Sequence, residues 1–341
     1  MRTAQHPYHQ GLHLQNFTAF EDADLTFSPG INAFAGENGS GKTHVLKALY
    51  AWQLASSREG YSIQDTFAET FQTHDTGQLT RLGTRGEAAA LLSGQYGDIA
   101  WTFSPVASAA SQPTGELKRK VDRPVFIPAM DMMGHTRRFV DAYDEVRLDF
   151  DRTCKDIVSL TGLERKNGRD PGAGNEVLIS KLGGEIDADE EGRFYLTTSL
   201  GRLPMPLVAE GIRKIATLVQ LQRNGWLSPG ATLMWDEPEV NLNPVLMGEV
   251  VGAIINLARS GVQVFLATHS YVILKELDLQ AVRDDAIRYF AYQRGEHGTA
   301  VFPTDDFAQL KPNPILEEFD SLYDRELTRS TGRTRRGEPV R

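Results

Sequence analysis

The sequence predicts an α/β protein built on a parallel β-sheet, with a loop that binds phosphate groups at one edge of that sheet. Three observations lead to this fold class. A glycine-rich loop stands between a short apolar segment and a segment with helical spacing of apolar residues. Two later apolar segments are joined by a helical one, and polar residues directly follow both of them. The order strand, helix, strand is typical of a parallel sheet.

The glycine-rich loop has the spacing G-x-x-x-x-G-K-[ST] of a phosphate-binding loop. Its residues are Gly36, Glu37, Asn38, Gly39, Ser40, Gly41, Lys42 and Thr43. Residues 31–35 before it have the composition of a buried strand, and residues 45–50 after it have helical periodicity. Glycines allow backbone N–H groups to approach phosphate oxygens, and a helix N-terminus attracts negative charge. Lys42 is expected to reach the β- and γ-phosphates, and the Thr43 hydroxyl is expected to bind Mg²⁺.

The rest of the chain divides into elements that local patterns predict. Strands are expected at 11–17, 20–27, 98–103 and 124–128, a hairpin with an acidic turn at 183–198, and helices at 136–160 and 210–224. Residues 55–95 indicate an irregular insertion, 104–116 a loop and 164–175 a polar connection. The Arg-rich tail at 327–341 lacks the apolar residues of a packed element and is expected to be disordered.

The two late strands are predicted at 231–235 and 262–267, with a helix at 247–258 between them. Asp236 and Glu237 follow the first of these strands, and His269 stands just beyond the second. Ligands of α/β sheets bind at the carboxyl ends of parallel strands. Asp236 is therefore expected to bind Mg²⁺. Glu237 is expected to act as general base toward water, and His269 to hydrogen-bond the γ-phosphate or that water.

Composition narrows the class of protein further. The chain has 341 residues, of which 40% are hydrophobic, and a formal net charge of −9. An acidic chain is a poor candidate for coating nucleic acid, although a local basic patch could still bind it. The single cysteine, Cys154, rules out a disulfide framework within the chain. No segment resembles a signal peptide or a membrane span, so a cytoplasmic protein without membrane contact is expected.

Taken together, these motifs resemble the ABC-type ATPase heads, and in particular the single-head bacterial ATPases related to the OLD, RecF and SMC proteins. The resemblance includes residues 12–20, the phosphate loop, residues 236–244 and residues 267–270. It implies a mixed-sheet core lobe that binds ATP and Mg²⁺, formed by residues 1–130 and 231–310. It also implies an inserted helical lobe at 131–230 and a head-to-tail homodimer with two ATP molecules at its interface.

In that family a signature segment of one copy contacts the ATP of the other, and residues 207–214 occupy its place. Gly211 retains the glycine at the helix start, whereas Ala209 replaces the usual serine. Arg213 or Lys214 could supply positive charge instead, although an exposed cation on the helix surface is an equally good interpretation. Residues 241–243 stand where the family's loop links the two sites. Asp131 is the candidate for the glutamine between the lobes.

The resemblance implies an ATPase that regulates a separately encoded effector, in phage defence or a toxin-antitoxin-like system. Residues 55–95 and the tail are then candidate contacts with that partner. A DNA-repair ATPase of the RecF type is the main alternative. A transporter subunit fits less well, because the signature serine and the glutamine are missing. A small-molecule kinase or GTPase has no need of the pair Asp236 and Glu237 followed by His269.

Overall fold

The computed structural model of the chain describes residues 7–57, 60–84, 86–105, 114–119, 121–135, 137–146, 148–163 and 176–331. Its strands are β1 (His9–Phe17), β2 (Phe20–Thr26), β3 (Ile31–Gly36), β4 (Ala88–Gly94), β5 (Gly97–Phe103), β6 (Thr114–Leu117), β7 (Val125–Ile127), β8 (Gly184–Ala188), β9 (Phe194–Thr198), β10 (Gly201–Pro204), β11 (Thr232–Asp236), β12 (Gln263–Thr268), β13 (Ile287–Gly295) and β14 (Gly298–Thr304). Its α-helices are α1 (Lys42–Ala55), α2 (Ile63–Phe71), α3 (Arg137–Val146), α4 (Arg152–Gly162), α5 (Glu176–Leu182), α6 (Glu210–Arg223), α7 (Pro244–Arg259), α8 (Tyr271–Gln280) and α9 (Pro314–Thr331), and the short 3-10 turns are η1 (Thr76–Leu79), η2 (Met205–Leu207) and η3 (Phe307–Gln309).

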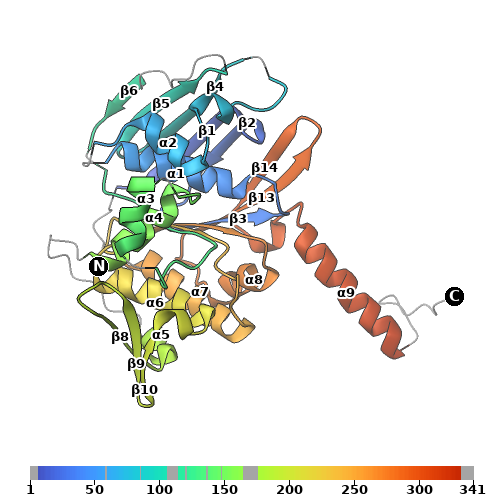
Figure 1. Ribbon diagram of the computed structural model, residues 1–341. Helices are drawn as coiled ribbons and strands as arrows, with labels where there is room; N and C mark the ends of the chain where they lie inside the picture. The colour runs from blue at the N-terminus through green and yellow to red at the C-terminus, as the bar shows by residue number, and fades with distance from the viewer. Residues whose placement is uncertain are drawn as a thin grey trace.

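A six-stranded sheet forms the centre of the molecule, in the order β14-β13-β3-β12-β11-β7 (Figure 1). Its strands from β13 to β7 are parallel, and β14 is an antiparallel edge strand. The predicted α/β fold with a mixed sheet is therefore confirmed. The strands β3, β12 and β11 are direct neighbours, so the phosphate loop and the polar residues that follow β11 and β12 meet at one edge of the sheet.

A second sheet of five antiparallel strands, in the order β2-β1-β4-β5-β6, packs over α1 and lies at the top of the view in Figure 1. The hairpin of β1 and β2 matches the prediction. The side chain of Phe34 on β3, together with Phe265 and Phe290 on its neighbours, joins a core that includes α1 and this second sheet. Consecutive residues of β3 point to opposite faces, so Ala33 and Ala35 belong to the other core.

That other core lies between the six-stranded sheet and the helices α4, α6, α7 and α8. The segment 131–230 also carries a small antiparallel sheet, β10-β9-β8, whose predicted acidic turn is present. Asp189 organises this turn, because its carboxylate accepts hydrogen bonds from the main chain of Glu191 and from Arg193. The acidic run therefore serves as a solvated turn, as expected from its sequence.

Residues 55–95 are more regular than the sequence indicates. They contain α2 and β4, and β4 is an inner strand that pairs with both β1 and β5. The expectation of an irregular insertion is wrong here. Alanine favours strands weakly, so the run of Ala88, Ala89 and Ala90 does not indicate a strand by itself, and pairing on both sides fixes it as one.

The predicted loop at 104–116 is also too long, since β6 begins at Thr114 and pairs with β5. Its residues 106–113 lie outside the described residues, as does the predicted connection at 164–175.

Two helical predictions also change. The helix expected at 136–160 is two helices, α3 and α4, because Asp151 caps the second by accepting a hydrogen bond from the Thr153 N–H at 2.8 Å. Of the tail at 327–341, residues 327–331 form the last turn of α9, so the expected disorder is wrong for that part. Figure 1 shows α9 projecting from the body of the molecule. Residues 332–341 lie outside the described residues.

Candidate nucleotide-binding site

The phosphate loop connects β3 to α1 and requires glycine at three positions. Gly36, Gly39 and Gly41 have positive φ angles of 156°, 74° and 93°. Space is limited as well, because a Cβ atom at Gly41 would lie 2.8 Å from the ring of Phe20 on the β1–β2 hairpin. Among the described residues, no side chain caps the start of α1, so the first N–H groups of the helix are left for another acceptor.

Lys42 and Ser40 lie inside this loop. The ammonium of Lys42 donates hydrogen bonds to the main-chain oxygens of Gly36 and Glu37, both at 2.8 Å. Burial lowers the pKa of Lys42, and the nearby carboxylates of Asp236 and Glu237 oppose that change. The Ser40 hydroxyl is buried and has no hydrogen-bond partner among the described residues. The loop therefore presents a buried cation and an unsatisfied hydroxyl.

Thr43 and Asp236 meet where α1 passes the end of β11. The Thr43 hydroxyl lies 3.0 Å from each carboxylate oxygen of Asp236. Burial raises the pKa of Asp236 to about 6, with the hydrogen bond from Thr43 acting in the opposite direction. Both residues are hard oxygen donors of the kind that Mg²⁺ prefers, so the two residues predicted to bind the metal lie side by side.

Glu237 and His269 lie next to this pair. The imidazole Nδ1 of His269 is 3.4 Å from a carboxylate oxygen of Glu237, and 39% of the His269 side chain is exposed. Glu237 has a left-handed backbone with φ +47°, and its N–H donates to the Ala267 carbonyl of β12 at 2.8 Å. The strand-end residues that the sequence selected are therefore brought together, with the Glu237 side chain at the surface of the site.

Glu239 is a site residue to which the sequence reasoning assigned no role. One carboxylate oxygen accepts hydrogen bonds from the Thr268 hydroxyl at 2.7 Å and from the His269 N–H at 2.9 Å, and it lies 3.4 Å from His269 Nδ1. Glu239 thus ties the turn after β11 to the end of β12. The unusual clustering of acids after β11 was the available signal, but the partners belong to another strand that only the fold brings near.

In the signature segment, Gly211 has a packing role that the sequence did not indicate. Gly211 is buried, and a Cβ atom there would lie 2.8 Å from the Asn241 carbonyl oxygen. The glycine therefore lets the start of α6 pack against the turn after β11, and its predicted contact with nucleotide stays a prediction. Ala209, just before the helix, is exposed.

The cations of this segment are occupied within the chain. Arg213 pairs with Asp131 and donates to the Val208 carbonyl, so the candidate for the interlobe glutamine is an ion-pair partner. Lys214 is 1% exposed and donates a hydrogen bond to the main-chain oxygen of Glu237 at 3.2 Å. The interpretation of either residue as an exposed cation on the helix surface is therefore wrong.

These observations fit a nucleoside triphosphate with Mg²⁺. The uncapped helix start, the buried Ser40 hydroxyl and the Lys42 ammonium can bind phosphate oxygens. The Thr43 hydroxyl and the Asp236 carboxylate can bind the cation between loop and strand. In the described ranges, this site included, no cluster of three or more His, Cys, Asp or Glu residues has the geometry to hold a metal ion.

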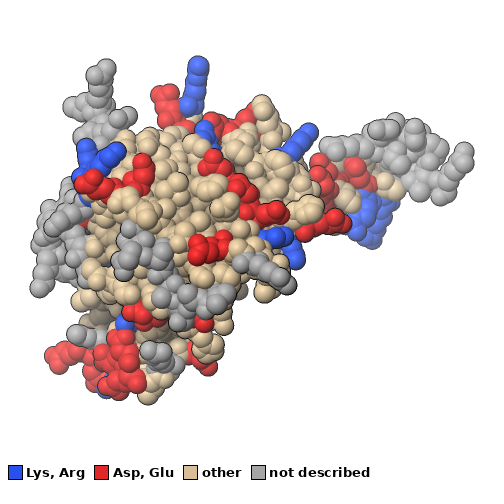
Figure 2. Space-filling model, turned by 90° about the horizontal axis from the view of Figure 1, so that it is seen from above, with Lys and Arg blue, Asp and Glu red and all other residues tan. Residues whose placement is uncertain are grey.

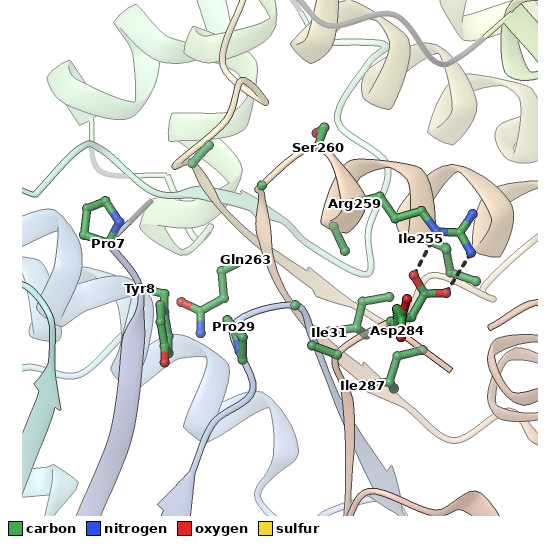
Figure 3. Close-up of a pocket in the computed structure, with 16 residues that line it drawn as sticks. Pro7, Tyr8, Pro29, Ile31, Ile255, Arg259, Ser260, Gln263, Asp284 and Ile287 are labelled. Atoms are coloured by element: carbon green, nitrogen blue, oxygen red, sulfur yellow. Dashed lines mark hydrogen bonds and ion pairs between the residues drawn. The ribbon is translucent and has the colours of Figure 1, made fainter. Parts of the chain in front are cut away.

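A separate cavity of about 340 Å³ lies at the opposite, amino-terminal ends of β3, β12 and β13 (Figure 3). Gly30, Ile31, Gln263 and Ile287 contribute to its wall, and Arg259 is paired with Asp285 at its rim at 2.7 Å. Because the phosphate loop follows the carboxyl end of β3, this cavity belongs to the other edge of the sheet. Among the described residues that line this cavity, Arg259 is the cation, and its pairing with Asp285 leaves it unavailable to a phosphate group.

The face of the molecule that Figure 2 shows gives little sign of a nucleic-acid interface. On the face drawn in Figure 2, the described Lys and Arg side chains stand singly among acidic ones and form no continuous basic patch. Among the helices that the structure describes, none is long and apolar enough to cross a membrane.

Two protein-family models match the chain. Residues 11–85 match a family described as "AAA domain", and residues 133–275 match one described as "AAA domain, putative AbiEii toxin, Type IV TA system". The first range contains the phosphate loop, and the second contains the signature segment, Asp236 and His269. The matches therefore cover both halves of the candidate site.

Curated relatives include DNA replication and repair protein RecF of Cytophaga hutchinsonii, 37% identical over 89 residues, which are 26% of this chain and 22% of that protein. RecF of Streptococcus equi subsp. zooepidemicus is 35% identical over 85 residues, or 24% of this chain and 22% of that protein. The matched stretch thus spans about a fifth of the length of these relatives.

Solved structures with a similar fold are SMC heads. An Smc head bound to the C-terminal winged-helix domain of ScpA has a TM-score of 0.59 at 14% identity, covering 87% of this chain and 98% of that one. The Smc head of Pyrococcus furiosus, bound to the C-terminal domain of ScpA, has a TM-score of 0.61 at 13% identity, covering 94% and 99%. The fold is that of an ABC-type ATPase head. About a quarter of the chain is similar in sequence to RecF proteins, and the fold as a whole is similar to that of SMC heads.

Proposed function

We propose that the chain binds and hydrolyses ATP with Mg²⁺, and that two copies associate head to tail around two ATP molecules. The observation that carries this proposal is the meeting of Thr43, Asp236, Glu237 and His269 at the ends of neighbouring parallel strands. ATP supplies the phosphoanhydride bond that is cleaved, and Mg²⁺ supplies positive charge at its phosphate oxygens.

The residues of the chain would divide the remaining tasks. Lys42 and the N–H groups of the loop bind the β- and γ-phosphates, while Thr43 and Asp236 hold Mg²⁺. Glu237 accepts a proton from the attacking water. His269 hydrogen-bonds the γ-phosphate or that water. Its ring is oriented by the carboxylates of Glu237 and Glu239, each of which has an oxygen 3.4 Å from Nδ1.

The test of hydrolysis compares Glu237→Gln with the wild-type protein. We expect Glu237→Gln to retain ATP binding and to lose turnover by roughly 10²-fold or more, the usual size of general-base assistance. Lys42→Ala should weaken binding itself. Glu185→Gln makes the same chemical change at an exposed position of β8 and should have no effect. A wild-type rate in Glu237→Gln would show that another group is the base.

Exposed apolar side chains support the proposed dimer. Met130, Leu207 and Val245 are 55%, 73% and 70% exposed. They adjoin Asp131, the signature segment and the turn after β11, where the family places its dimer interface. Burial of such side chains in a second copy would be favourable.

Light scattering with and without ATP tests this interface in the Glu237→Gln background. We expect ATP to double the mass, and Leu207→Asp to abolish that change. Leu200→Asp is the matched control, because Leu200 is 97% exposed on the turn before β10, away from the signature segment. A monomer mass at ATP concentrations far above the binding constant would refute the sandwich.

We further propose that ATP-driven association regulates a separate effector protein in phage defence or a toxin-antitoxin-like system. The match over residues 133–275 to a model described with a type IV toxin-antitoxin system favours this context. So do the SMC heads, whose described complexes contain a partner protein, ScpA. Residues 55–95, which include the 94% exposed Leu82, and the tail after Glu326 are the candidate contacts.

A RecF-like role in DNA repair is the second candidate, and the RecF relatives favour it. Truncation after Glu326 separates the two roles. Loss of a co-purifying protein partner from the truncated chain supports the effector role. Loss of DNA binding whose affinity falls steeply with salt concentration supports the repair role. If both properties survive truncation, the tail takes part in neither.

A further inference from the structure

Lys214 occupies an unusual place for a lysine. It is 1% exposed, and its ammonium donates a hydrogen bond to the main-chain oxygen of Glu237 at 3.2 Å. Burial lowers the pKa of this ammonium, while the carboxylates of Glu210 and Glu239 act in the opposite direction. Burying an ammonium is costly unless specific contacts compensate for it, so the contact with Glu237 points to a defined role.

The residue that Lys214 contacts has an uncommon backbone conformation. Glu237 has φ +47°, a conformation that a non-glycine residue keeps only when its surroundings hold it. The N–H of Glu237 donates a hydrogen bond to the Ala267 carbonyl at 2.8 Å. The main-chain oxygen of Glu237 accepts hydrogen bonds from the Val240 N–H at 3.2 Å and from the Lys214 ammonium. Lys214 is the side chain that fixes this peptide from the side of α6.

The helix α6 touches the same turn at a second point. Gly211 packs so closely on the Asn241 carbonyl that a Cβ atom would lie 2.8 Å from it. Residues 211 and 214 lie three positions apart and therefore share one face of the helix. The start of α6 consequently contacts both ends of the turn 237–241.

We propose that Lys214 is a positioning residue that couples the start of α6 to the Glu237 carboxylate. A second copy that contacts Ala209 and Glu210 thereby sets the orientation of the base for hydrolysis. The exposed Ala209 and half-buried Glu210 precede the buried glycine, so a partner can reach the helix end without displacing Lys214. This inference rests on the proposed ATPase function and dimer.

The test replaces Lys214 by methionine, which keeps an unbranched side chain and removes the ammonium. Lys181→Met is the matched control, because Lys181 lies on α5 in the same segment and its ion pair with Glu249 is partly exposed. Both variants are made with Glu237 and with Glu237→Gln, and turnover, ATP KM and ATP-driven dimer mass are measured. Hydrogen exchange of residues 237–242 is followed without nucleotide. Lys214→Leu, which also lacks an N–H donor, replaces the methionine variant if that one does not fold.

We expect Lys214→Met to lower kcat at least about tenfold with KM and dimer mass within about twofold, because a displaced base loses its effective concentration. In the Glu237→Gln background the same change should have almost no further effect, since coupled residues are not additive. Exchange of 237–242 should rise in Lys214→Met and stay unchanged in Lys181→Met.

Three results would overturn the inference: a wild-type kcat in Lys214→Met, an equal loss of rate in both backgrounds, or unchanged exchange of the turn. Absence of hydrolysis in the wild-type protein would instead overturn the proposed function. In that case the exchange measurement still decides whether Lys214 holds the turn.

Discussion

Two glycine-to-alanine substitutions in helices should change stability in opposite directions. At Gly211, the new Cβ atom would lie 2.8 Å from the Asn241 oxygen and 3.3 Å from Leu242 Cδ2, so the backbone of the turn has to move. At Gly248 on α7, the nearest atoms are 3.4 Å away and belong to the flexible Glu276 carboxyl group. At both sites alanine favours the helix more than glycine does. The two sites differ in the space available for the added Cβ atom.

The magnitudes follow from these distances. Alanine in place of helical glycine stabilises by up to about 1 kcal/mol, whereas overpacking against a fixed neighbour costs about 1–3 kcal/mol. Gly211→Ala should therefore lower the free energy of unfolding by about 1 kcal/mol, and Gly248→Ala should raise it by a similar amount. In a chain of 341 residues, each change shifts the melting temperature by roughly 1–2 °C.

Thermal unfolding followed by circular dichroism measures both variants side by side. Gly211→Ala should also weaken ATP-driven association, because it displaces the turn from α6, while Gly248→Ala should not. A Gly211→Ala protein that melts above the wild type would refute the close packing of α6 on Asn241. Equal shifts of the same sign in both variants would refute the reasoning from local space.

Two further predictions concern buried polar groups. Glu239→Ala should lower stability by about 1–3 kcal/mol, because it removes the acceptor of the buried Thr268 hydroxyl, and should slow turnover through His269. Glu239→Gln, whose amide oxygen can still accept, should keep most of the melting temperature, and equal melting of the two variants would contradict this role. Burial lowers the pKa of His9 from its usual 6.5 to about 4, so the unfolded chain takes up a proton at a higher pH than the folded protein. The stability present above pH 6.5 is then lost toward pH 4, by up to about 3 kcal/mol. Urea unfolding should show a shallower loss over that range in His9→Gln, and identical pH profiles would count against the burial of a neutral imidazole.

The sequence by itself determined the phosphate loop, its flanking strand and helix, and the parallel strands before Asp236 and His269. These features depend on local requirements: glycine for positive φ, apolar runs for buried strands, and polar residues at strand ends. Such requirements involve only a few neighbouring residues, so they can be recognised in the sequence without knowledge of the fold. They were sufficient to predict the class of fold and the residues that meet at the candidate site.

The tertiary structure decided what depends on distant partners. The strand β4 exists because β1 and β5 pair with it, although its alanines favour a strand weakly. Gly211 serves packing against Asn241, Lys214 turns inward to the Glu237 carbonyl, and Glu239 binds the end of β12. Each of these contacts joins segments far apart in the chain. The role of each of these side chains depends on the residues that the fold places beside it. The spacing of residues along the sequence does not indicate which residues those are.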